Sequence, residues 1–265
     1  MSLLPDSILQ PLKVWHHRRT LRSSPDFDEP DLRVVRELVQ SGTTAVDLGA
    51  NIGVYTKVLS DVVGPRGRVI SVEPVPQTFA VLSRLVRSLG MTNVSCVNAA
   101  ISDHAGEVVM ELPSYNTGGT NFYQATVVTA SNSKPAKSMR QVKVPSLTLD
   151  TLVSGKGKID FVKCDIEGHE LACLLGAEKT LNSDAPAWLV EIWGNPDEAG
   201  SLPMRTFRIF EDHAYTPWWF DGQRLIRREA GDRSTNYFFL RQEHIFRLKQ
   251  RAPIFFAEAG RTSAL

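Results

Sequence analysis

The chain has 265 residues, of which 42% are hydrophobic, and its 30 basic and 29 acidic residues leave a formal net charge of +1. A chain of this length can bury a full core and is most simply one large domain. Because the charge is nearly balanced, no strong field attracts nucleic acid or an anionic membrane, so we expect neither as a partner.

The three cysteines form no CxxC pair, which argues against a disulfide framework or a zinc site. The N-terminal stretch places its charges after a short apolar run that is broken by two prolines and an aspartate, the reverse of a secretory signal. No apolar run approaches the roughly 20 residues that span a bilayer. We therefore expect a cytoplasmic protein without a membrane span.

Residues 1–30 show no regular pattern and carry a small basic cluster, so we expect an irregular N-terminal extension there. From Asp31 the pattern becomes ordered, and the run LRVVRELVQSG has apolar residues at helical spacing before a stop at Gly42. The sequence thus predicts one domain over residues 31–265.

Strands and helices then alternate along the chain. Buried strands are expected at 44–49, 68–74 and 94–102, with helices at 54–63 and 77–90 between them. This alternation favours an α/β fold with an open, mostly parallel sheet and helices on both faces.

The alternation pauses over residues 103–150, where two short strand patterns flank a polar loop that contains Gly118 and Gly119. Long loops in compact domains are often functional, so we expect an insertion on the substrate side, with the two glycines in a loop that closes over the site. The remaining expected elements are a strand at 158–165, a helix at 170–181, a strand at 187–193, a helix at 205–215, and closing antiparallel strands at 224–230 and 236–242.

The turn in AVDLGANIGVYT lies between the first strand and the first helix of this alternation, where backbone N–H groups and the helix dipole face a ligand. A dinucleotide fingerprint needs GxGxxG, but Asn51 stands between Gly49 and Gly53 where the second glycine should be. This disfavours NAD and an oxidoreductase.

Asp47 at the end of the first strand suits a cationic amine, and Glu73 at the end of the second suits both hydroxyls of a ribose. An amine, a ribose and a turn of small residues together indicate S-adenosylmethionine. The alternative is a structural glycine turn with a capping aspartate.

Seven motifs in register give the sequence a family likeness. The chain resembles FkbM-type S-adenosylmethionine-dependent methyltransferases in VDLGANIGVYT, VEPVPQTF, NAAISDHAGE, NTGGTN, VPSLTLDTL, FVKCDIEGHE with LLGAEKTL, and PAWLVEIWG. These motifs cover about residues 43–194. Cys164 departs from the aliphatic residue usual at its place.

The resemblance implies a class I methyltransferase fold, which is a Rossmann-like, doubly wound sheet of seven strands with the last strand antiparallel. It also implies O-methylation of a hydroxyl on a small metabolite, sugar or glycan. Carried over by position, it places the methionine part of the cofactor at Asp47, Gly49, Asn51 and Gly53, the ribose at Glu73, the adenine near Ser102 and Asp103, and the reactive methyl beside Asp165.

The base that removes the acceptor's proton has more than one candidate. His169 is one, because its unperturbed pKa suits proton acceptance at neutral pH. Asp165 and Glu191, at the ends of adjacent strands, are catalytic candidates through a second mechanism, in which they share a hard cation such as Mg²⁺ that acidifies a bound hydroxyl. Since Ile192 and Trp193 follow Glu191, further ligands are scarce, and we do not expect a metal.

Glu167 and Glu170 allow two interpretations. Acids in the first turn of a helix are stabilised by its dipole, and both residues also belong to the family motif, which favours contact with the substrate. For the whole chain, the alternative to an enzyme is a sensor or interaction module that binds S-adenosylmethionine without transferring its methyl group.

Overall fold

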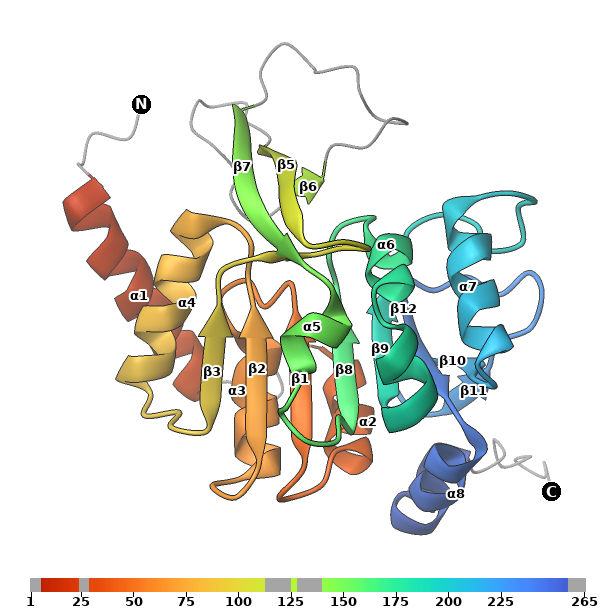
Figure 1. Ribbon diagram of the computed structural model, residues 1–265. Coiled ribbons are helices and arrows are strands. Elements are labelled where there is room, and N and C mark those ends of the chain that lie inside the picture. The colour runs from red at the N-terminus through yellow and green to blue at the C-terminus, as the bar shows by residue number, and fades with distance from the viewer. Residues whose placement is uncertain (1–5, 24–28, 113–124, 128–139, 257–265) are drawn as a thin grey trace, which may run out of the picture.

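The computed structural model describes residues 6–23, 29–112, 125–127 and 140–256. In these ranges, helices cover both faces of a central sheet, and a smaller sheet stands beyond the carboxyl ends of its central strands (Figure 1). The main sheet comprises β1 (Thr44–Leu48), β2 (Arg68–Val72), β3 (Val94–Val97), β8 (Phe161–Cys164), β9 (Ala187–Glu191), β10 (Thr216–Phe220), β11 (Leu225–Arg227) and β12 (Asn236–Leu240). The smaller sheet comprises β4 (Ala100–Ile101), β5 (Gly106–Leu112), β6 (Thr126–Val127) and β7 (Arg140–Leu147). The helices are α1 (Asp6–Ser23), α2 (Asp31–Leu38), α3 (Val54–Val63), α4 (Pro76–Ser88), α5 (Leu149–Val153), α6 (Glu170–Leu175), α7 (Leu202–Asp212) and α8 (Gln242–Arg251), with a π-helical turn at Thr180–Asp184 and a 3₁₀ turn at Pro253–Phe256.

The main sheet has the strand order β11-β10-β12-β9-β8-β1-β2-β3. The strands from β9 to β3 are parallel, whereas β12 lies antiparallel to both β9 and β10. The resemblance implied seven strands with the last one antiparallel, and β12 is that last strand. The described residues add an eighth, the short β11, which extends the edge by pairing with β10.

Successive residues of the parallel strands enter two different cores, as expected for a sheet that is covered on both faces. On β1, Ala45 packs in the core formed with α2, α3 and α8, while Val46 packs in the core formed with α5, α6 and α7. Both cores are fully buried, so the carboxyl ends of the central strands have a rigid support.

The N-terminal segment differs from its prediction. Residues 6–23 form α1 rather than an irregular extension, and α1 packs along α4 (Figure 1). Leu21 is 4% exposed and joins Val81 and Leu85 of α4 in a small apolar cluster. The basic residues around it hid this contact, because their charges dilute the helical apolar pattern.

Two further elements differ from their predictions. The expected strand over 94–102 is divided between β3 and β4, which belong to different sheets. The expected helix over 170–181 ends at Leu175 with Gly176 as its C-cap, and a separate π-helical turn covers Thr180–Asp184. The inserted strands β5 and β7 pair along their length in the smaller sheet, while Gly118 and Gly119 lie outside the described residues.

Candidate functional site

Two cavities open at the carboxyl edge of the main sheet. The first has a volume of about 620 Å³ and lies between the ends of β2 and β8 and the smaller sheet. The second has a volume of about 800 Å³ and lies beside α3, with His17 of α1 on its wall. Both are lined by Gly49, Asn51 and Asp165, so they meet where the first strand ends.

The turn after β1 requires glycine at its first position. Gly49 has φ +73°, and a Cβ there would lie 1.7 Å from the carbonyl oxygen of Asp165. No other residue therefore fits without moving the end of β8, the neighbouring strand in the sheet. Gly53 has φ +91° and begins α3 without a side-chain cap. The turn therefore passes close to β8 and leaves the first N–H groups of α3 without a capping side chain.

Glu73 follows β2 and is held by backbone groups alone. Its Oε2 accepts a hydrogen bond from Asn51 N at 3.0 Å, and its Oε1 accepts one from Val75 N at 2.9 Å. Burial raises the pKa of Glu73 to about 7, although these two N–H groups favour its ionised form. Each oxygen keeps a second lone pair, and the side chain lines the first cavity.

Asp47 is the second-last residue of β1, and one of its two carboxylate oxygens is unpaired within the described residues. Its Oδ2 accepts a hydrogen bond from Thr56 Oγ1 at 2.6 Å. Its Oδ1 is buried and has no partner in the described part of the chain, as is also true of the Asn51 amide oxygen. Burial raises the pKa of Asp47. Since both residues line the second cavity, these orphaned acceptors fit a ligand that brings donors, such as the cationic amine of S-adenosylmethionine.

Lys163 is a site residue that the sequence analysis missed. It faces Asp47 across the register of β1 and β8 and is only 5% exposed. Its Nζ donates to Asp165 Oδ2 at 2.6 Å and lies 4.9 Å from the ring centroid of Tyr55. Burial alone would lower the pKa of Lys163, but the charges of Asp165 and Asp47 outweigh it and raise that pKa. A lysine inside the apolar run FVKC was the available signal, because a buried lysine needs a partner.

Asp165 follows β8 and Glu191 ends the adjacent β9, and the contact between them shifts both of their pKa values. Burial would raise the pKa of Asp165, but Lys163 and a hydrogen bond with Glu191 lower it. For Glu191, burial and the same hydrogen bond to Asp165 raise the pKa to about 8. The two shifts run in opposite directions, so Glu191 is the member of the pair that holds a proton more tightly.

The described residues contain no group of three or more histidine, cysteine, aspartate or glutamate side chains arranged to hold a metal ion. Asp165 and Glu191 do come together, yet the Lys163 ammonium already contacts Asp165. A divalent cation at this pair would face that ammonium at close range.

His169 lies at the first cavity, on the side of the smaller sheet. Its Nε2 is 3.0 Å from Ser102 Oγ, and Ser102 Oγ donates to Asp103 Oδ1 at 3.1 Å. Burial lowers the pKa of His169, so the ring is neutral at pH 7. The structure thus joins two residues that the resemblance placed near the adenine with one that the sequence offered as the base.

Glu167 and Glu170 have different surroundings. Glu170 begins α6, is buried, and accepts a hydrogen bond from Gly168 N at 2.9 Å, as an acid at a helix N-terminus does. Glu167 precedes the helix with φ +55° and lines the first cavity. Burial raises the pKa of Glu167, with the Asp165 charge adding to this effect.

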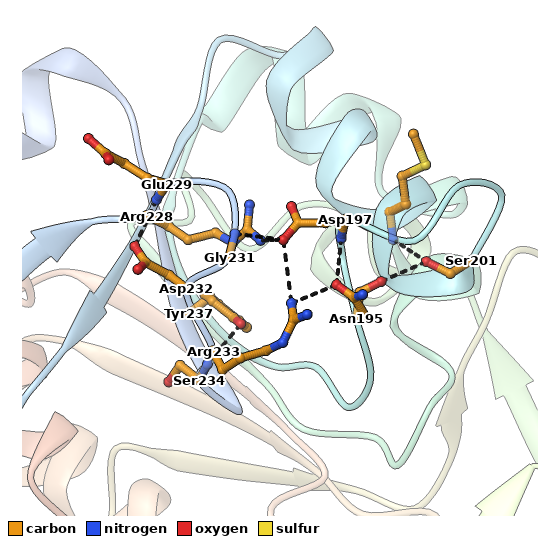
Figure 2. A network of polar contacts seen from close by, with 11 residues as sticks. Asn195, Asp197, Ser201, Arg228, Glu229, Gly231, Asp232, Arg233, Ser234 and Tyr237 are labelled. Atoms are coloured by element: carbon orange, nitrogen blue, oxygen red, sulfur yellow. Dashed lines mark hydrogen bonds and ion pairs between the residues drawn. The ribbon is translucent and has the colours of Figure 1, made fainter.

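Polar contacts join the loop that follows β9 to the loop that precedes β12 (Figure 2). Asp197 accepts hydrogen bonds from Arg228 Nη2 at 2.6 Å and from Gly231 N at 2.9 Å, and Arg233 Nη1 donates to Asn195 Oδ1 at 2.6 Å. These contacts link the loop after β9 to the loop before β12, the neighbouring strand in the sheet.

No helix in the described ranges has the length and apolar character that crossing a membrane requires.

Residues 47–217, more than half of the chain, match the protein-family model of the Methyltransferase FkbM domain. Among solved structures, the chain is similar to methyltransferase FkbM from Methylobacillus flagellatus KT, with 17% identity, a TM-score of 0.52 and coverage of 82% of this chain. The match covers 50% of that protein, so this chain spans about half of its length.

The chain is also similar to fibrillarin from Aeropyrum pernix, which was solved with natively bound S-adenosyl-L-methionine, at 14% identity and a TM-score of 0.45 over 78% of this chain and 72% of that one. No curated protein matches the chain. The fold is that of a class I methyltransferase, S-adenosylmethionine is the typical cofactor of the matched family, and the chain belongs to the FkbM methyltransferase family.

Proposed function

We propose that this protein transfers a methyl group from S-adenosylmethionine to a hydroxyl group of a small metabolite, sugar or glycan. The observation that carries the proposal is the meeting of the two cavities at Asp165. One cavity offers Glu73 as an acceptor for a ribose, and beside the junction the Asp165 carboxylate is held by Lys163 and Glu191.

The first cavity suits the adenosine part of the cofactor. Glu73 is fixed by two backbone N–H groups, and its remaining lone pairs can accept both hydroxyls of a ribose. Val75, Met110 and Ala125 are buried side chains on the wall of the same cavity and suit a flat, largely apolar ring. The carboxylate and the apolar wall together match the two chemical characters of an adenosine.

The second cavity suits the methionine part. The unpaired Asp47 Oδ1 would accept from the α-amine, and Gly49 lets the backbone approach the ligand closely. When bound, the cofactor supplies an electrophilic methyl group on a sulfonium. Holding the acceptor oxygen in line with it can contribute several kcal/mol to catalysis.

Asp165 is the base that this geometry favours. As the acceptor hydroxyl is methylated it must lose its proton, and the ionised Asp165 lies at the junction of the cavities to accept it. Glu191 already holds the pair's proton, and the Lys163 ammonium balances the remaining charge. His169 has its Nε2 hydrogen-bonded to Ser102, on the side of the smaller sheet, which supports a different role for it.

The proposal is tested with S-adenosylmethionine labelled in its methyl group and a panel of acceptors that carry hydroxyl, amine or thiol groups. We expect label in products of hydroxylated sugars or metabolites, together with formation of S-adenosylhomocysteine. Label transfer to amines alone would overturn the O-methyltransferase assignment. Cofactor binding without transfer to any acceptor in the panel would favour a sensor or interaction module.

A further inference from the structure

A chain of hydrogen bonds lies behind the ring of His169. Asp103 Oδ1 is 3.1 Å from Ser102 Oγ, and Ser102 Oγ is 3.0 Å from His169 Nε2. Ser102 is 1% exposed and sits between the two. Asp103 follows it at the surface, with 46% of its side chain exposed.

The Asp103 carboxylate fixes which group donates in each of these two hydrogen bonds. An ionised carboxylate can only accept hydrogen bonds, and a hydrogen bond from His104 lowers the pKa of Asp103, so Asp103 stays ionised at neutral pH. Ser102 has one hydroxyl hydrogen, which it donates to Asp103. Ser102 must therefore accept from His169, and Nε2 of His169 carries the hydrogen.

This direction determines the tautomer of the histidine. In a neutral imidazole only one nitrogen carries hydrogen, so with a hydrogen on Nε2 the other nitrogen, Nδ1, is an acceptor. Burial lowers the pKa of His169, which keeps the ring neutral. Nδ1 makes no hydrogen bond to any other described residue.

The acceptor, Nδ1, belongs to His169, which lies on the wall of the first cavity. His169 shares this wall with Ala99, Ala100 and Ile101, while Glu73 lines the same cavity and suits the ribose. The same cavity reaches from Glu73 to the smaller sheet, whose strand β4 contains Ala100 and Ile101, so it has room for a base attached to a ribose at Glu73.

We propose that His169 selects adenine as the base of the cofactor by accepting a hydrogen bond at Nδ1 from its exocyclic amine, with Ser102 as the positioning residue that fixes the tautomer. This inference rests on the proposed function, since it assigns a specificity residue within the same cofactor cavity. Hypoxanthine carries a carbonyl oxygen where adenine carries the amine, so two acceptors would face each other there.

The test compares S-adenosylhomocysteine with S-inosylhomocysteine by isothermal titration. We expect the wild-type protein to prefer the adenosyl compound by roughly 10- to 100-fold, the range for one mismatched hydrogen bond in a buried site. In His169→Phe, which keeps a ring but has no acceptor, that preference should fall at least about tenfold. His213→Phe is the matched control, because His213 lies at the C-terminal end of α7 and lines neither cavity, and the preference should be unchanged.

Ser102→Ala keeps the histidine and removes only the group that orients its hydrogen. We expect the preference to fall roughly three- to tenfold, and nitrogen NMR of the wild-type protein to show hydrogen on Nε2 and none on Nδ1. Hydrogen on Nδ1, or an unchanged preference in both variants, would overturn the inference. Failure of the wild-type protein to bind S-adenosylhomocysteine at all would instead overturn the proposed function.

Discussion

Glu73 and Asp165 follow the two strands that flank β1, and the contrast between them explains how one sheet edge serves two purposes. Glu73 is held by backbone N–H groups, which are neutral and fixed. Asp165 is held by the side chains of Lys163 and Glu191, which carry a charge and a proton. A carboxylate with backbone partners suits binding, whereas one that shares a proton with side chains suits proton transfer.

The largest expected effect comes from a change at Asp165, the carboxylate assigned to proton transfer. Asp165→Asn removes the base, so turnover with a hydroxyl acceptor should fall by roughly 10²- to 10⁴-fold, measured as label transferred per enzyme. Affinity for S-adenosylhomocysteine should change far less. Asp61→Asn on the outer surface of α3 is the control. Turnover of Asp165→Asn within a few-fold of wild type would contradict the role of Asp165.

The next effect concerns the turn that brings the two carboxylates together. Gly49→Ala would place a Cβ 1.7 Å from the Asp165 carbonyl oxygen, so it should cost several kcal/mol of unfolding free energy in urea. Gly90→Ala is the matched control, because Gly90 also has positive φ but open space around it, and it should cost about 1–2 kcal/mol. Equal losses would show that the close approach to β8 does not constrain the turn.

A smaller effect concerns the proton on Glu191. Its pKa rises from 4.5 to about 8 on folding, so between these values the folded state holds a proton that the unfolded state has lost. The unfolding free energy should therefore decrease as pH rises through this window. Glu191→Gln should make that decrease shallower, measured by urea unfolding at several pH values. A curve that coincides with wild type would show that Glu191 is ionised in the folded protein.

The sequence predicted the fold well wherever a local signal and the buried pattern agreed. Glycine stops, apolar runs and the motif order located the parallel strands and the acids at their ends. The sequence did not predict α1, because its contact with α4 depends on Leu21 and a few neighbours among many charges. Nor did it predict the end of α6 at Leu175, where Gly176 lies close to the Ser102 carbonyl of a distant segment, a contact that the local sequence does not reveal.

For the site, the sequence indicated individual residues but not which side chains pair with one another. Asp47, Glu73, Asp165 and His169 do line the two cavities. Some of their partners come from distant segments, as Ser102 with His169 and Glu191 with Asp165 illustrate, and the pKa shifts of Asp165 and Glu191 depend on such a contact. Spacing along a chain carries no information about which carboxyl group holds a proton.

The most direct test of the central claim is titration of S-adenosylmethionine into the wild-type protein and Glu73→Gln, with the exposed Glu107→Gln as control. We predict binding to wild type and control in the micromolar range. In Glu73→Gln we predict affinity lower by about tenfold or more, because the amide loses charge and turns a donor toward a backbone N–H group. Equal affinity in all three proteins, or no binding to wild type, would contradict the account.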